Sequence, residues 1–290
     1  MANPRADYSP IFHRKPLKLP GNARVAVWPC INVEEWDINA TMARAVLPSP
    51  QGAAVTPDIA NFAWFDYGLR VGFWRLKQVL DRHGIRATVS LNASVCDTYP
   101  QLVRESLEAG WEMLGHGVTQ RVIHSEPDER KVIQQTIRMI SDFTGVPLRG
   151  WMGPGLAETF DTPDILAEEG IEYVADWCND DQPYEMKVKS GRLVSIPYTV
   201  EINDIPIYIV QHHRSPEIFE RARDQFDTLY REGAESARIM CISTHPYITG
   251  VPHRIKYYDM IFDYVRQFEG VVFMTGSEIL DWYNETTADS

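Results

Sequence analysis

The sequence ARVAVWPCINVEE, residues 23–35, is an apolar run that ends directly in polar residues. Residues 23–32 are rich in β-branched and other apolar side chains, which is typical of a buried strand. Asn32 closes this run, and the carboxylates of Glu34 and Glu35 follow it. In a barrel of parallel strands, substrates bind where strands end and loops begin. This stretch therefore predicts a strand of a parallel sheet and one corner of an active site.

Comparable apolar runs recur along the chain and alternate with amphipathic stretches. The clearest helix covers residues 71–84, where apolar residues recur near helical spacing until a closing glycine. Such alternation is typical of βα units around a parallel sheet, so we predict an α/β fold with about seven parallel strands. The predicted strands cover residues 23–32, 86–92, 111–116, 171–177, 205–212, 238–245 and 270–275.

Length and composition favour one large domain. The chain has 290 residues, 44% of them hydrophobic, which is enough to build a sizeable core. Residues 23–290 are therefore predicted to form a single catalytic domain. Residues 1–22 are rich in proline and charge, and we expect an extended arm that lies on a neighbouring subunit of a homo-oligomer.

Charge and hydropathy limit the partners. A net charge of −12 would repel a phosphate backbone, so nucleic acid is not expected as a partner. No window approaches the roughly 18 consecutive apolar residues that span a bilayer, and the start of the chain has no leader pattern, so we expect no membrane partner and a cytoplasmic location. The four cysteines are widely spaced and are predicted to be reduced thiols.

Further polar residues occur where strands are predicted to end or loops to begin. Each alone has a structural explanation, such as a cap, a surface ion pair or a buried imidazole. Together they favour hydrolysis, which needs a base for water, an acid for the leaving group and a positive pole for the oxyanion. The candidates are Glu34, Glu35, His116, Arg149, Asp176 and His245.

Aromatic and histidine side chains near these positions are candidates for substrate binding. Trp36, Trp151 and Trp177 could form an apolar wall of the site, although core packing explains them equally simply. His212 and His213 either bind substrate or cap the predicted strand 205–212. The insertion 37–67 is predicted to be an ordered loop of the active site.

The order of these motifs resembles the polysaccharide deacetylase family, carbohydrate esterases with a distorted (β/α) barrel and a metal-bound water. The resemblance runs from about residue 23 to residue 283, and it implies that barrel and a small-molecule substrate. The family's motifs correspond here to Glu34-Glu35, His116, Arg149 to Gly153, Asp176-Trp177 and Ile242-Ser243-Thr244-His245.

Two departures bear on the metal that this resemblance implies. The acidic pair is Glu-Glu instead of Asp-Asp, and Gln120 stands where the family has a second histidine. An amide is a poor ligand for a transition metal compared with imidazole. Glu35 and His116 remain as candidate ligands of Zn²⁺ or another divalent metal, with His124 as a distant third, and a mechanism without metal stays equally open.

A closer resemblance is to the branch of metal-independent allantoinases and cyclic imide hydrolases. Two places differ, because the branch has His-Gly-Trp-Arg at residues 116–119 and an arginine after its Gly-Trp loop. The shared stretches are Asn32-Val33-Glu34-Glu35, residues 67–75 (YGLRVGFWR), Gly150-Trp151, residues 179–184 (NDDQPY), and Pro197-Tyr198-Thr199 to Asn203-Asp204.

This resemblance implies a hydrolase of non-peptide C–N bonds that opens a small cyclic amide, imide or ureide. Glu34 or Glu35 would activate water, and His116, with Glu35, would orient it or hold a metal. His245 would protonate the leaving nitrogen, because an amide nitrogen leaves poorly as an anion. Arg149 and Asp176 would tune this acid and base. The alternatives are a metal-dependent deacetylase of an N-acetylated sugar or similar amide, and a barrel that only binds a ligand.

Overall fold

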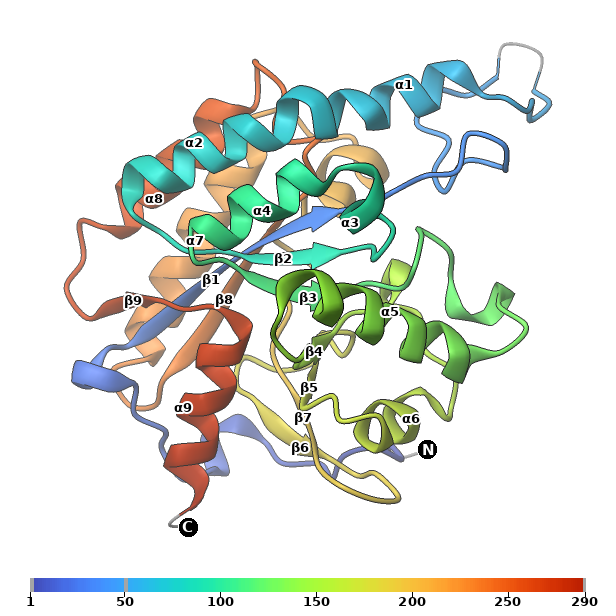
Figure 1. Ribbon diagram of the computed structural model, residues 1–290. Helices are drawn as coiled ribbons and strands as arrows, with labels where there is room; N and C mark the ends of the chain where they lie inside the picture. Colours follow the sequence, from blue (N-terminus) through green and yellow to red (C-terminus); the bar gives the residue numbers. More distant parts are fainter. Residues whose placement is uncertain (1–2, 50–51, 289–290) are drawn as a thin grey trace.

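The computed structural model describes residues 3–49 and 52–288, so positions 1–2 of the predicted arm and 50–51 of the insertion lie outside it (Figure 1). Its centre is one curled sheet in the order β6-β7-β5-β4-β3-β2-β1-β8, with β9 paired to β1. All pairs are parallel except β6 with β7. The strands are β1 Val25–Val33, β2 Thr88–Leu91, β3 Glu112–Gly115, β4 Gly150–Trp151, β5 Tyr173–Val174, β6 Tyr184–Met186, β7 Leu193–Ser195, β8 Arg238–Thr244 and β9 Val271–Phe273.

An irregular segment after β7 brings the chain back to the free edge of β8. Ser243 donates its backbone N–H to the carbonyl of Ile202 at 3.1 Å, and Asn203 forms an isolated parallel bridge with Ser243. Two residues earlier in β8, the backbone N–H of Cys241 donates to Oγ1 of Thr199 at 3.2 Å. The sheet therefore curls into a distorted (β/α) barrel whose last side is a loop, which confirms the predicted fold.

Helices cover the outside of this sheet (Figure 1). The helix predicted at residues 71–84 is present as α2, which ends at Gly84 in the left-handed conformation, as its closing glycine indicated. None of the helices within residues 3–49 and 52–288 is long and apolar enough to cross a membrane. The α-helices are α1 Ile59–Tyr67, α2 Phe73–His83, α3 Val95–Thr98, α4 Pro100–Glu108, α5 Glu129–Thr144, α6 Thr162–Glu168, α7 Glu217–Glu232, α8 Ile255–Val265 and α9 Gly276–Ala288.

The predicted strand at 205–212 was wrong, because this segment is a π-helical turn, η6 Ile205–Val210. The side chain of Asn203 accepts a hydrogen bond from the backbone N–H of Ile205 at 2.9 Å, and this local bond turns the chain before a strand can form. Inside the insertion, helix α1 was not predicted. It begins where the Asp58 side chain accepts a hydrogen bond from the backbone N–H of Asn61.

Alternation along β1 decides which side chains enter the barrel. Ala26, Trp28 and Cys30 belong to the apolar cluster inside the barrel. The intervening Val25, Val27, Ile31 and Val33 pack in the larger cluster between sheet and helices. Because successive side chains of a strand point to opposite faces, the same alternation puts Asn32 and Glu34 inside, at the carboxyl end of the strand.

The N-terminal arm contacts its own domain. Arg5 forms two hydrogen bonds with the carboxylate of Asp164, both at 2.9 Å. Arg14 pairs in the same bidentate way with Asp180 at 2.8 and 2.6 Å. In Figure 1 the arm runs from the N-terminal label along the lower side of the molecule to β1. Contact of the arm with a second subunit remains a prediction.

Candidate active site

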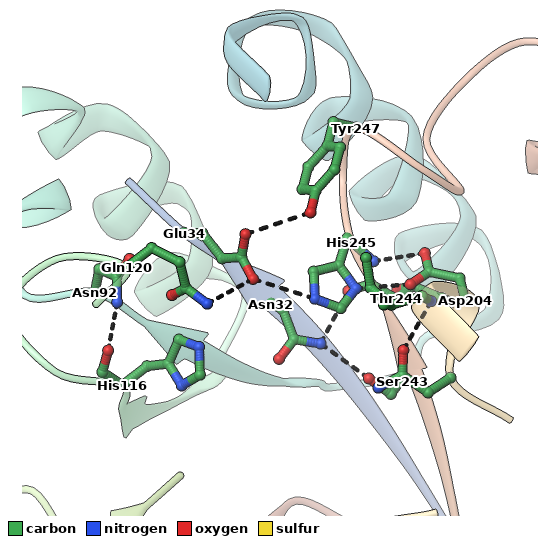
Figure 2. Close-up of polar contacts among 12 residues, drawn as sticks. Asn32, Glu34, Asn92, His116, Gln120, Asp204, Ser243, Thr244, His245 and Tyr247 are labelled. Carbon is green, nitrogen blue, oxygen red and sulfur yellow. Dashed lines mark hydrogen bonds and ion pairs between the residues drawn. The ribbon is translucent and has the colours of Figure 1, made fainter. Parts of the chain in front are cut away.

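Glu34 is the centre of a buried polar cluster at the carboxyl ends of β1 and β8 (Figure 2). Its side chain is 4% exposed. Oε1 accepts a hydrogen bond from Nε2 of Gln120 at 3.0 Å and lies 3.4 Å from Nε2 of His245. Oε2 accepts from Nε1 of Trp36 at 2.8 Å and from the hydroxyl of Tyr247 at 3.4 Å. Burial would raise the pKa of Glu34, but His245 and the other neighbours hold it below its usual value, so the carboxylate is ionised at neutral pH.

His245 lies between two buried carboxylates. Its Nδ1 donates to Oδ1 of Asp204 at 2.6 Å, and its backbone N–H donates to Oδ2 at 2.7 Å. Thr249 completes the environment of Asp204 by donating its hydroxyl to Oδ2 at 2.6 Å. Burial opposes the charge of His245, yet Asp204 and Glu34 together raise the pKa of His245 to about 9. His245 is therefore a protonated imidazole at neutral pH, with one N–H facing Glu34.

Asp204 was not predicted as a catalytic residue. It follows the barrel-closing segment and is fully buried. The sequence did contain one signal, since Asn203-Asp204 belonged to a stretch shared with the allantoinase branch. No local pattern shows, however, that a residue 41 positions before His245 would bond its imidazole.

His116 enters the cluster in a different state. Its Nδ1 lies 2.6 Å from the carbonyl oxygen of Met152, and a carbonyl can only accept, so the proton is on Nδ1. Nε2 then keeps a free lone pair. Burial lowers the pKa of His116, and the nearby charge of Glu34 only partly opposes this effect. The cluster thus combines a neutral imidazole, an ionised carboxylate and a protonated imidazole.

Glu35 is not brought into this cluster, contrary to its prediction as a base or metal ligand. Its Oε2 accepts from the hydroxyl of Thr98 in α3 at 2.9 Å. Its backbone N–H donates to the side chain of Asn92 at 2.7 Å. The reason is the alternation that places Glu34 inside, because the next side chain along the chain then points to the other face.

Arg149 and Asp176 occupy different ends of the barrel. Arg149 precedes β4 instead of following a strand, so it lies at the amino end, where it pairs with Glu172 and with Asp281 of α9 at 2.6 and 2.7 Å. The prediction that Arg149 lies beside the acid and base is therefore wrong. Asp176 does follow β5, and its Oδ1 accepts from the backbone N–H of Gly153 at 2.8 Å.

The three tryptophans predicted to bind substrate lie in different places. Trp36 stacks on Phe65 with ring centroids 5.3 Å apart and, with Tyr247, encloses Glu34. Trp151 is 1% exposed and packs in the core outside the barrel. Trp177 lies at the carboxyl end of β5 and donates Nε1 to Glu158 at 2.9 Å.

The histidine pair after η6 lies at the surface. His212 is exposed and adopts a positive φ of 56°, and His213 pairs with Glu217 at the start of α7 at 3.6 Å. The structure therefore places this pair in solvent and joins neither residue to the buried cluster. Its simplest role is to close the turn before α7.

One cation beside the cluster was missed. Arg44, from the insertion 37–67, faces Tyr247, the residue whose hydroxyl contacts Glu34, and its charge partly opposes the rise that burial causes in the pKa of Tyr247. Within the described part of the chain, no carboxylate lies within ion-pair distance of Arg44. The insertion gave no periodic signal, so its composition could indicate an active-site loop but could not single out this residue.

The donor set does not fit the divalent metal that the family resemblance implies. Across residues 3–49 and 52–288, no group of three His, Cys, Asp or Glu side chains is arranged to hold a metal ion. Gln120 turns an N–H toward Glu34, and both oxygens of Glu34 already accept from N–H or O–H donors. One of these neighbours is the protonated His245, whose charge opposes a second cation in the same pocket.

Comparisons with known proteins agree with the fold. The family model described as polysaccharide deacetylase matches residues 56–174. A Schizosaccharomyces pombe protein, provisionally named a polysaccharide deacetylase, is 27% identical over 292 residues and covers 90% of each chain. The crystal structure of PuuE allantoinase superimposes with a TM-score of 0.83 at 25% identity, over 97% of this chain and 99% of that one. A Pseudomonas aeruginosa structure named as a probable polysaccharide deacetylase has a TM-score of 0.84 at 25% identity, over 96% and 97%.

Proposed function

We propose that the chain belongs to the polysaccharide deacetylase family, whose model matches residues 56–174, and that it is a hydrolase of non-peptide C–N bonds that opens a small cyclic amide, imide or ureide. The observation that supports this proposal most is the buried series Asp204, His245 and Glu34, in which a protonated imidazole stands between two carboxylates. Amide hydrolysis needs both a base for water and an acid for the leaving nitrogen, and this series supplies the two side by side.

The attacking water binds between Glu34 and His116. The ionised carboxylate of Glu34 and the free Nε2 of His116 are both acceptors, so they take the two protons of one water and aim its lone pair at the substrate carbonyl. As the oxygen attacks, Glu34 accepts one proton. His116 fixes the direction of attack, because its own proton is held on Nδ1 by Met152.

His245 completes the reaction. Its Nε2–H protonates the leaving nitrogen as the C–N bond breaks, while Asp204 holds the ring in position. Glu34 then carries the proton taken from water, and it lies 3.4 Å from the deprotonated Nε2 of His245. Return of that proton restores both residues, so the net reaction consumes one water and leaves a carboxyl group on one side of the broken C–N bond and an N–H group on the other.

The positive pole for the developing oxyanion is assigned to Arg44 in place of Arg149. Arg44 lies beside Tyr247 and is not neutralised by a carboxylate within the described residues. A guanidinium in that position binds a carbonyl oxygen or a neighbouring ureide oxygen of the substrate. Trp36, which stacks on Phe65, gives Glu34 an apolar surrounding.

Turnover of a substrate panel tests this function. The panel contains cyclic imides, cyclic ureides and N-acetyl sugars, each with and without chelator. We expect ring opening that survives chelator, because the donor set does not fit a metal. The matched variant is Glu34→Gln, which keeps the shape of the side chain and removes the base.

Three outcomes would overturn parts of the proposal. Cleavage of N-acetyl sugars alone would assign the chain to deacetylation of open-chain amides. Activity that chelator abolishes and that zinc restores would contradict the metal-free mechanism. A Glu34→Gln variant with full turnover would remove Glu34 from the reaction.

A further inference from the structure

A second pair of carboxyl groups lies at the same end of the barrel as the proposed active site. Asp176 follows β5, and Glu158 lies in the loop between β4 and α6. Oδ1 of Asp176 accepts from the backbone N–H of Gly153 at 2.8 Å, and Oε2 of Glu158 accepts from Nε1 of Trp177 at 2.9 Å. The two remaining oxygens, Oδ2 of Asp176 and Oε1 of Glu158, are buried and receive no hydrogen from another described residue. A Cβ built on Gly153 would lie 3.4 Å from Oδ2 of Asp176 and 2.5 Å from the carbonyl of Ala157, the residue before Glu158, and each carboxyl group acts on the pKa of the other.

Two neighbouring carboxyl groups can satisfy each other's buried oxygens only if one of them is protonated, because two carboxylate oxygens are both acceptors. Burial is the largest effect on each group, and it raises the pKa of Glu158 to about 7 and holds the pKa of Asp176 well above its usual value. The other charges facing Glu158 are Arg5 from the arm, which favours ionisation, and Glu129 at the start of α5, which opposes it. Arg5 is itself bonded to Asp164, so its influence is reduced.

The β4–α6 loop, which contains Glu158, also begins with the residue that contacts His116. Gly153 donates to Asp176, and the preceding residue, Met152, provides the carbonyl that keeps the proton of His116 on Nδ1. The same loop contains Leu156 at a φ of 54°, a left-handed conformation that is unfavourable for a residue with a side chain. Gly153 also accepts from the backbone N–H of Leu156 at 2.8 Å, so the residue bonded to Asp176 belongs to this turn.

We propose that Asp176 and Glu158 share one proton and are positioning residues for His116. The shared proton joins the β4–α6 loop to the end of β5 and so fixes the Met152 carbonyl against the imidazole. Loss of the proton to solvent places two negative charges in contact, separates the loop from β5 and lets the His116 ring change its tautomer. This inference rests on the proposed function only where its effect on turnover is concerned.

Glu158→Gln is the informative variant, because its amide can donate to Asp176 and still accept from Trp177 without a shared proton. Glu158→Ala removes the bond altogether and is the matched comparison. For a group with a pKa of about 7, the protonated fraction falls from about 0.9 at pH 6 to about 0.1 at pH 8, so kcat of the wild type should fall about tenfold across that range. For Glu158→Gln, the ratio of kcat at pH 6 to kcat at pH 8 should be close to one. Glu158→Ala should have a low kcat at both pH values. A tenfold fall retained in Glu158→Gln, or no fall in the wild type, would overturn the proposal.

A readout that needs no substrate separates this proposal from the proposed function. Nitrogen NMR of the histidine rings, with His116 assigned by a His116→Gln variant, reports which ring nitrogen holds the proton. We expect the Nδ1–H tautomer at pH 6, a mixture at pH 8, and the Nδ1–H tautomer at both pH values in Glu158→Gln. An unchanged tautomer in the wild type from pH 6 to 8 would contradict the proposal even if a cyclic amide is opened. The expected tautomer change would support it even if no tested substrate is cleaved.

Discussion

The two ends of the barrel each hold a cation between two carboxylates. At the carboxyl end, His245 lies between Glu34 and Asp204, with side chains 7%, 4% and 0% exposed. At the amino end, Arg149 lies between Glu172 and Asp281, with side chains 29%, 47% and 55% exposed. Water screens the second group, and an arginine keeps its proton at every usable pH. The first group is shielded from water, and a histidine can release its proton, so only this arrangement can move a proton during a reaction.

The largest effect is expected from removing the buried cation. His245→Ala should reduce kcat by about 10²- to 10⁴-fold, the range typical of a lost general acid. It also leaves Glu34 and Asp204 without their shared partner, so circular dichroism should accompany the assay to establish folding. His245→Gln, which keeps a donor but cannot transfer a proton, is the control for structure. Full turnover by a folded His245→Gln protein would remove the acid role.

Asp204→Asn should change how the stability of the protein depends on pH. The pKa of His245 is raised in the folded protein, so the ion pairs of His245 with Asp204 and Glu34 stabilise the fold. This stabilisation is complete at pH values below the ordinary histidine pKa, and it is lost as the pH rises through about 9. Asp204→Asn removes one of the charges that raises this pKa. The free energy of unfolding should therefore differ most between variant and wild type near pH 6 and least near pH 10, measured by urea denaturation. A difference independent of pH would show that Asp204 acts only by packing.

Arg44→Met should have a smaller effect, mainly on substrate binding. The apolar stem is kept and the charge removed, so KM should rise about tenfold if the guanidinium contributes one charged hydrogen bond to the substrate. Steady-state kinetics on the best substrate of the panel would measure this. Arg70→Met is a suitable control because Arg70 is a largely exposed arginine paired with Asp66. Equal KM values in Arg44→Met and the wild type would place Arg44 outside the substrate site.

The smallest effect is expected at the amino end. Arg149→Met should change kcat by less than about twofold and the free energy of unfolding by about 0–1 kcal/mol, as is usual for exposed ion pairs. Kinetics and urea denaturation of the single variant test both values. A loss of turnover comparable to that of His245→Ala would mean that the two ends are coupled through the barrel.

The sequence predicted the barrel and the centre of its site because both depend on local patterns. Apolar runs alternating with helices define the sheet, and a polar residue directly after a strand, as in the case of Glu34, His116 or His245, lies at its carboxyl end. Arg149 was misplaced because β4 is only two residues long and gives no apolar run, so its start could not be located. Asp204, Arg44 and Glu158 lie in loops, and their positions depend on long-range contacts that no spacing along the chain encodes.

The most direct test of the proposed acid–base mechanism is an NMR titration of the His245 ring in the resting protein. We expect a pKa of about 9, lowered in Asp204→Asn, because two buried carboxylates hold the proton on this imidazole. A wild-type pKa near the ordinary histidine value of about 6.5 would contradict it, since His245 would then be largely neutral at pH 7 and could not serve as the acid for a leaving nitrogen.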